Sequence, residues 1–360
     1  GLVSLSSKLL NEGTKELGAT KFAEKLEENA ISLAASNGFE TFVIELSNLK
    51  EQSKKGIELL TALLKSPNYT QDTLNKLKTM QTGSLKRKEN DFDYVANNQL
   101  KSVLFKGTTL ENSAAGTIES ISKIELKDIE NFISQTVCLE NLIIVAGGDF
   151  ELKEFEKLVK PLLETLNVGK KAQLEEVNFI SKKEEKVLIK DTQQAYIYFG
   201  SSFNINSKDE ENYKAKVASF ILGGSGFGSR LMEEIRVKRG LAYSAYGSIS
   251  INKSHSYFNG YLQTKNETAD EAKKLVGEII EDFVKNGVTN DELSAAKNFL
   301  TGSEPLRSET LSQRLNRAFT LYYRGLEPNY SQKELEKIQN LELTDLNNYI
   351  KSHNEINNLT

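Results

Sequence analysis

The residues best suited to chemistry in this chain lie in one stretch of its second half, GSRLMEEIRVKRGLAYS (228–244). Arg236 and Tyr243 stand seven residues apart in this stretch. A guanidinium group can hold peptide carbonyl or carboxylate oxygens through paired hydrogen bonds, and a tyrosine hydroxyl can donate a hydrogen bond to an oxyanion. Both side chains are therefore hydrogen-bond donors suited to oxygen ligands.

The elements that must position this pair can be predicted from the same stretch. The apolar spacing predicts an amphipathic helix over 229–238 with Leu231 and Ile235 on one face, and Gly240 is expected to end it. The alternating pattern that follows predicts a strand over 241–251, which carries the tyrosine.

This block resembles the C-terminal signature of the pitrilysin family of zinc peptidases, which includes insulinase and the mitochondrial processing peptidase. The family pattern is SRL followed by IR-x-KRGLAY, and nearly every position of 228–244 fits it. The resemblance implies that Arg236 positions a peptide substrate and that Tyr243 stabilises the transition state, both facing a zinc ion. A structural interpretation of the pair is also open: Arg236 would form a salt bridge at the helix end, and Tyr243 would be a half-buried strand residue.

The opening residues, GLVSLSSKLLNEGT (1–14), resemble the metal-binding stretch of the same family, G-L-x-H-x-x-E-H-x-L-x-x-G-T. The two histidine ligands then fall on Ser4 and Lys8, and the general base falls on Ser7. The resemblance places the third metal ligand near 82–84, in a segment that has no carboxylate. A hydroxyl is a poor zinc ligand and a lysine adds positive charge, so this chain is expected to bind no metal.

Other metal ligands are scarce. The chain has two histidines, His255 and His353, and one cysteine, Cys138. Neither histidine has a second histidine four residues further on, as a zinc site on one helix needs. Polar residues flank both histidines, which predicts surface positions for them.

Composition limits the remaining function classes. The chain has 360 residues and a net charge of −4, which argues against a general nucleic-acid binder. The longest apolar run, 142–148, is too short to span a bilayer, so no membrane span is expected. The glycines of GGSGFG (223–228) do not have the spacing of a nucleotide-binding loop.

An internal repeat indicates the architecture. The endings LNKLKTMQTGS (74–84) and LSAAKNFLTGS (293–303) match, and the same order of predicted elements precedes each. Such long-range self-similarity indicates two homologous domains, and strands followed by helices indicate an α+β fold with helices on one face of an antiparallel sheet. The resemblance implies that the two domains form half of a clamshell. The expected divisions are an N-terminal domain over 1–165, a charged linker over 166–186 and a C-terminal domain over 187–360.

Periodicity predicts the elements of each repeat. The first repeat is expected to hold helices over 17–29, 51–65 and 70–80 and strands over 31–35 and 39–46; the second is expected to hold a strand over 256–264 and helices over 269–285 and 290–300. A buried strand is predicted over 142–150, and an alternating strand over 186–199 is predicted to start the second sheet. Phe319, Tyr322 and Tyr323 recur at helical spacing and are expected in the core.

The retained and the lost residues together favour a non-catalytic subunit of a two-chain zinc peptidase. The resemblance implies that some bacterial members divide the work, one chain keeping HxxEH and the other keeping the Arg and the Tyr. This chain would then be inactive alone and would carry no zinc. It would pair 1:1 with an HxxEH-bearing homologue that holds the zinc and cleaves peptides, and without that partner a homodimer is expected.

Two other interpretations stay open. The chain could be a purely structural or assembly protein of the same fold, like the core subunits of the respiratory cytochrome bc complex, or a homologue that has lost all activity. A chain released from chemistry has no reason to keep Arg236 and Tyr243, which favours the peptidase subunit. One cysteine does not decide the compartment, which is either the bacterial periplasm, the favoured choice, or the cytoplasm.

Overall fold

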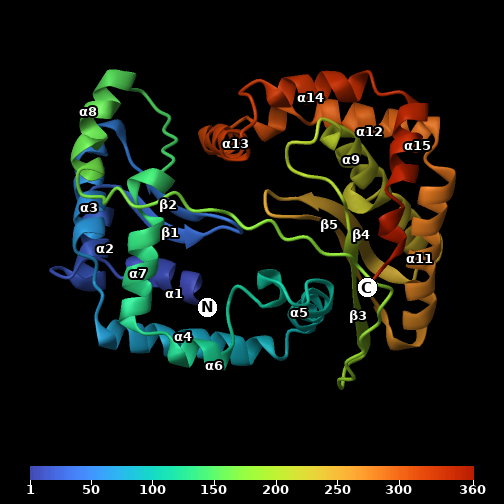
Figure 1. Ribbon diagram of the computed structural model, residues 1–360, viewed down its shortest axis with the longest axis horizontal. Helices are drawn as coiled ribbons and strands as arrows, with labels where there is room; N and C mark the ends of the chain where they lie inside the picture. The colour runs from blue at the N-terminus through green and yellow to red at the C-terminus, as the bar shows by residue number, and fades with distance from the viewer. The chain divides into compact units, whose positions relative to one another are not determined.

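The computed structural model describes all 360 residues, and their contacts divide the chain into two compact units. The first unit comprises residues 1–90 and 113–173, and the second comprises 91–112 and 174–360. Figure 1 labels the helices and strands of both units. No helix combines the length and the apolar character that crossing a bilayer would take.

The first unit consists of one β-hairpin and seven helices. Its elements are α1 (Leu2–Leu10), α2 (Gly18–Glu28), β1 (Ser32–Asn37), β2 (Phe42–Ser47), α3 (Ser53–Lys65), α4 (Gln71–Lys88), α6 (Ile118–Lys123), α7 (Leu126–Thr136) and α8 (Leu152–Leu163). The strands β1 and β2 pair antiparallel, with Ser32 opposite Ser47 and Asn37 opposite Phe42. Helix α4 is longer than expected and continues to Lys88 instead of ending at residue 80.

Helix α1 is held by apolar contacts on two sides. Its Leu5 and Leu9 belong to a buried cluster with Leu74 of α4, whereas Leu10 belongs to a second cluster with Phe22 of α2. Because all three leucines are fully buried, the helix has a fixed rotation about its axis. The positions of its polar side chains are therefore set by the core.

The strand predicted over 142–150 is wrong. This segment contains neither helix nor strand, and Leu142 and Ile144 are exposed. An isolated apolar run forms a strand only where a neighbouring strand supplies hydrogen bonds, and β1 and β2 pair only with each other. Periodicity alone does not reveal that such a partner is lacking.

The second unit places helices around a three-stranded antiparallel sheet of order β3-β5-β4. Its elements are α5 (Phe92–Leu104), β3 (Gln194–Ser202), α9 (Asn212–Ser219), α10 (Arg230–Met232), β4 (Ala242–Ile251), β5 (Ser256–Lys265), α11 (Ala269–Asn286), α12 (Asn290–Gly302), α13 (Leu311–Arg324), α14 (Tyr330–Gln339) and α15 (Leu343–Ser352). Helices α9, α11 and α15 lie on one face of the sheet (Figure 1), where Phe199, Phe258 and Leu262 of the strands pack against them. The predicted α+β class with antiparallel sheets is confirmed.

Two observed boundaries differ from the expected ones. Helix α5 falls within 1–165, the range expected for the first domain, but it belongs to the second unit because Leu100 and Leu104 pack against Tyr198 and Tyr257 of the sheet. The second sheet begins at Gln194, and the residues that precede it are not a strand. Ile189, for example, is 90% exposed.

The repeat is visible in the order of the elements. The series α2-β1-β2-α3-α4 of the first unit corresponds to α10-β4-β5-α11-α12 of the second. Helices α4 and α12 contain the matching segments, and their equivalent apolar residues are buried: Leu74 with Leu293, and Leu77 with Ala296.

Candidate functional site

The stretch that carries Arg236 forms a short, firmly packed helix. The Ser229 hydroxyl accepts a hydrogen bond from the Met232 N–H at its start, and Leu231 and Ile235 are fully buried as expected. The last turn, Glu233–Val237, is π-helical, a form often found at functional sites. Gly240 adopts a left-handed φ of 64° and turns the chain into β4, so the predicted stop lies where it was expected.

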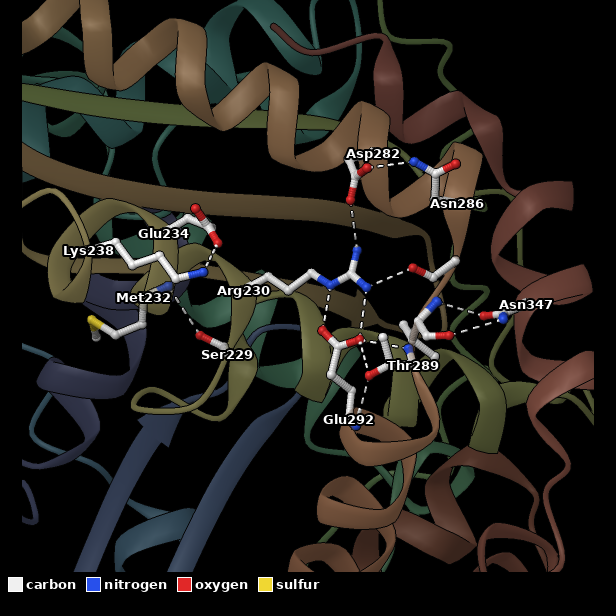
Figure 2. A network of polar contacts seen from close by, with 12 residues as sticks. Ser229, Arg230, Met232, Glu234, Lys238, Asp282, Asn286, Thr289, Glu292 and Asn347 are labelled. Atoms are coloured by element: carbon white, nitrogen blue, oxygen red, sulfur yellow. Dashed lines mark hydrogen bonds and ion pairs between the residues drawn. The ribbon is translucent and has the colours of Figure 1, made fainter.

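Arg230 anchors this helix to the next two helices (Figure 2). Its Nε and Nη2 donate to the two carboxylate oxygens of Glu292 at 2.6 and 2.8 Å, and Nη2 also donates to the Gly287 carbonyl oxygen at 2.7 Å. Asp282 lies 3.3 Å from Nη1. Since Glu292 also caps α12 through Thr289, one guanidinium ties α10 to the junction of α11 and α12.

Two further cations of the motif are paired with a single carboxylate. Lys238 and Arg239 each approach a different oxygen of Glu234 at 2.6 Å. The hydrogen bond from Lys238, followed by that from Arg239, lowers the pKa of Glu234 below its usual value. Both cations therefore share one carboxylate partner within the chain, at the helix end.

Arg236 is arranged differently from these three cations. It forms no ion pair, and the centre of its guanidinium group lies 4.6 Å from the centroid of the Phe227 ring. A guanidinium over an aromatic face is attracted to the ring while its N–H groups stay available for another acceptor. Phe227 itself is 69% exposed.

Tyr243 lies at the start of β4 and is 80% exposed, with no hydrogen bond to its hydroxyl. The structural interpretation expected a salt bridge for Arg236 and a half-buried Tyr243, and neither is present. Both residues present unused donors on the surface of the second unit.

The three predicted positions of the replaced metal site come together on α1. The Ser7 hydroxyl lies 3.1 Å from the Ser4 carbonyl oxygen, and the Lys8 ammonium donates to Oε1 of Gln81 on α4. The amide group of Gln81 donates to the Ser4 hydroxyl at 3.4 Å and to the Ala115 carbonyl oxygen at 2.9 Å. Partial burial, followed by the charge of Lys88, lowers the pKa of Lys8 below its usual value.

These residues do not fit a zinc ion. Zinc needs anionic or neutral donor ligands with a free electron pair, whereas Lys8 directs a cation into the cluster and the Gln81 side chain is occupied by hydrogen bonds. No group of three or more His, Cys, Asp or Glu side chains anywhere in the chain is placed to hold a metal.

Comparison with known proteins identifies the family. The sequence model of the family described as "Peptidase M16 inactive domain" matches residues 123–300 of this chain. A protein from Helicobacter pylori named "Non-peptidase homolog YmxG" is 46% identical over all of this chain and over 83% of its own length. The chain belongs to the peptidase M16 family. Both matches carry names of inactive proteins, so the chain is an inactive M16 member, as the resemblance to zinc peptidases predicted.

Solved structures agree with the M16 fold. A peptidase M16 inactive domain from Pseudomonas fluorescens aligns with a TM-score of 0.92 at 22% identity, covering 100% of this chain and 87% of that one. A chain of complex III from Candida albicans aligns with a TM-score of 0.77 at 16% identity, covering 98% of this chain and 83% of that one. At these identities the likeness concerns the fold alone.

Gln81 was not predicted as part of the replaced metal site of this M16 protein, because the family resemblance placed the third metal ligand near 82–84. The internal repeat contains a signal for it. Matching LNKLKTMQTGS with LSAAKNFLTGS places Gln81 opposite Leu300, and both side chains are buried. A polar residue at a core position of a repeat must find polar partners, which here are Lys8 and Ser4.

The predicted surface positions of the histidines are wrong. His255 is 7% exposed and lies among the aromatic rings of Phe105 and Tyr257. His353 stacks on Phe203 at 4.4 Å and lies 2.8 Å from a Glu355 oxygen. Polar sequence neighbours do not reveal aromatic partners from distant segments. The expected core position of Tyr322 is also wrong, since this side chain is 70% exposed.

Proposed function

We propose that this chain is the non-catalytic subunit of a two-chain zinc metallopeptidase. Its partner would be a homologous M16 chain that carries HxxEH and the zinc ion, and the substrate would be a peptide. Ser4, Ser7 and Lys8, together with Gln81, would be the remnant of the metal site, and Arg236 and Tyr243 would act on the substrate beside the partner's zinc.

One observation carries the proposal: among the cations of the signature, only Arg236 is left without a carboxylate. Arg230 is bound by Glu292, and both Lys238 and Arg239 are bound by Glu234. Structural cations in this stretch are thus paired inside the chain, while Arg236 is held on a ring with its donors unused. An unpaired guanidinium in a motif whose other cations all have carboxylate partners suits the binding of an external oxygen ligand.

The chemistry assigned to the pair follows from their groups. Arg236 would bind a carbonyl or carboxylate oxygen of the peptide and hold the chain in register. The Tyr243 hydroxyl would donate to the oxygen of the scissile carbonyl as negative charge develops there. The partner's zinc would supply the activated water.

A structural role for the whole protein is the alternative. The fold is shared with a chain of complex III, so M16 units can serve outside proteolysis. A purely structural chain would tolerate the loss of an exposed tyrosine without effect, which separates the two functions experimentally.

The test is reconstitution with the HxxEH-bearing homologue from the same organism. Tyr243→Phe keeps the ring and removes only the hydroxyl donor, so turnover of a fluorogenic peptide should fall by about a hundredfold. Association with the partner should be unchanged, because the ring remains. Wild-type turnover by the Tyr243→Phe mixture, or a partner that is fully active by itself, would overturn the proposal.

A further inference from the structure

The face of the second unit's sheet on which α5 packs carries a row of three tyrosines, one from each strand. Tyr198 of β3 and Tyr246 of β4 are both directly opposite Tyr261 of the central strand β5. The ring centroids of Tyr198 and Tyr261 are 5.5 Å apart and those of Tyr246 and Tyr261 are 5.4 Å apart. All three rings therefore lie on one face of the sheet, and the Tyr261 ring contacts the rings on both sides of it.

This face is opposite to the one that forms the core. The strand neighbours Phe199 and Leu262 point into the main apolar cluster, so the tyrosines must point away from it, since side chains alternate along a strand. The three rings are partly exposed. Burial, followed by the charge of Asp93, raises the pKa of Tyr198 to about 12, so its hydroxyl remains a neutral donor at ordinary pH.

One end of the row is continuous with the surface around Arg236. A Cβ atom at Gly226 would lie 3.8 Å from the Tyr246 ring, and Gly226 directly precedes Phe227, on which Arg236 is stacked. The row thus begins beside Arg236, the residue proposed to position the substrate.

The other end of the row borders a small hollow beneath α5. The hollow has a volume of about 90 Å³ and is lined by Leu100, Lys101, Tyr198, Tyr257, Asn259 and Tyr261, among others. The hollow is large enough for several water molecules or for one modest side chain.

We propose that the tyrosine row and this hollow bind an extended polypeptide segment of the substrate, an inference that rests on the proposed function. Two strand spacings of about 4.8 Å make the row about 10 Å long, which matches about three residues of extended chain. Tyrosine rings supply a large, rigid contact area with a polar edge, which suits a peptide backbone and its mixed side chains. Asp91 and Asp93 beside Tyr198 disfavour the phosphates of a nucleic acid.

Binding to the isolated chain tests this proposal without the partner. The probe is a fluorescein-labelled, unstructured peptide in which Leu, Phe and Lys are spaced by Gly and Ser, titrated by fluorescence anisotropy. Tyr198→Ala and Tyr246→Ala should each raise the Kd by about tenfold, as expected for truncation of an aromatic contact. Tyr198→Phe retains the ring and should bind like the wild type.

The matched control is Tyr322→Ala, which removes an exposed tyrosine of α13 in the same unit and should leave the Kd unchanged. Circular dichroism confirms that each variant is folded. The proposal is overturned if the wild-type chain shows no saturable binding, if neither alanine variant in the row weakens binding, or if Tyr322→Ala weakens it equally. Stronger binding of a labelled single-stranded oligonucleotide that depends on the row would assign the face to nucleic acid instead. Because turnover is not measured, failure here is distinct from failure of the Tyr243→Phe test.

Discussion

At the scale of single residues, the cations of the motif differ in whether they form ion pairs within the chain. Arg230, Lys238 and Arg239 have carboxylate partners, whereas Arg236 rests on Phe227. The family motif singles out Arg236 by resemblance, but the sequence does not show which of the four cations have carboxylate partners. Only their partners, two of which come from α11 and α12, separate their roles.

Arg236→Ala should therefore impair the reconstituted complex more than substitution of a neighbouring cation. Loss of its hydrogen bonds to substrate should lower kcat/KM by about tenfold to a hundredfold, with a higher KM and a lower kcat, because positioning serves both the ground state and the transition state. Steady-state kinetics with a fluorogenic peptide measures this. Lys238→Ala is the matched control, and an equal loss from both variants would show that the effect arises from charge alone.

The polar cluster on α1 and α4 predicts how zinc binding could be restored. Gln81 contacts both Ser4 and Lys8, so a carboxylate at position 81 would lie within reach of histidines at positions 4 and 8. The triple variant Ser4→His, Lys8→His, Gln81→Glu should bind about one zinc per chain, because these residues supply three ligands and remove the ammonium. Elemental analysis after dialysis measures the metal content.

The control for this experiment is Ser4→His, Lys8→His with Gln81 retained, which has only two ligands. Wild-type protein should carry no stoichiometric zinc. If the triple variant retains no more zinc than the double variant, then Ser4, Lys8 and Gln81 are not the remnant of a metal site.

At the scale of elements, the Arg230 network should contribute measurably to stability. Arg230→Met leaves the partly buried Glu292 without its cation and should lower the free energy of unfolding by about 2 kcal/mol. Urea denaturation followed by circular dichroism measures the change. Arg314→Met on the exposed side of α13 is the matched control and should change stability little.

The same network predicts a dependence on pH. Burial tends to raise the pKa of Glu292, but hydrogen bonds from Arg230 and Thr289 outweigh it and leave the pKa below the ordinary value of 4.5. The folded state then binds fewer protons than the unfolded state. The stabilisation from Glu292 is therefore complete above pH 4.5, the ordinary pKa of a glutamate, and is lost as the pH falls through the lower pKa that Glu292 has in the folded state. Arg230→Met should weaken this acid dependence. An unchanged slope of stability against pH would show that Glu292 is not responsible.

The sequence predicted elements well where local signals decide them. Apolar periodicity located α3, α11 and α12, and Gly240 marked the end of the motif helix. The strand predicted over 142–150 failed because pairing is not local: an apolar run does not specify whether a partner strand is present.

For the candidate site, too, the sequence predicted which residues take part but not the contacts between distant segments. Family motifs singled out the candidates Arg236 and Tyr243 in one stretch and Ser4, Ser7 and Lys8 in the other. The stacking of Arg236 on Phe227 and the buried contact of Gln81 depend on how separate segments pack, which spacing in the sequence does not encode.

At the scale of the whole molecule, the proposed division of work requires a stable complex. Arg236 and Tyr243 can act at a scissile bond only if a partner holds its zinc beside them, so the two chains must stay associated through each turnover. Stable interfaces commonly bury about 1,600 Å² in total and have aromatic residues near their centres. The second unit exposes Phe227 and Tyr243 on its surface.

Mixing this chain with the HxxEH-bearing homologue should therefore give a 1:1 heterodimer with one zinc, contributed by the partner, whereas this chain alone should sediment as a metal-free homodimer. Sedimentation velocity combined with elemental analysis of the separated species measures both properties. A Tyr243→Phe mixture serves as the control, because it should assemble like the wild type and yet turn over slowly. Two species that sediment independently at several salt concentrations would contradict the two-chain enzyme, since a donor that does not remain beside the metal cannot stabilise the transition state.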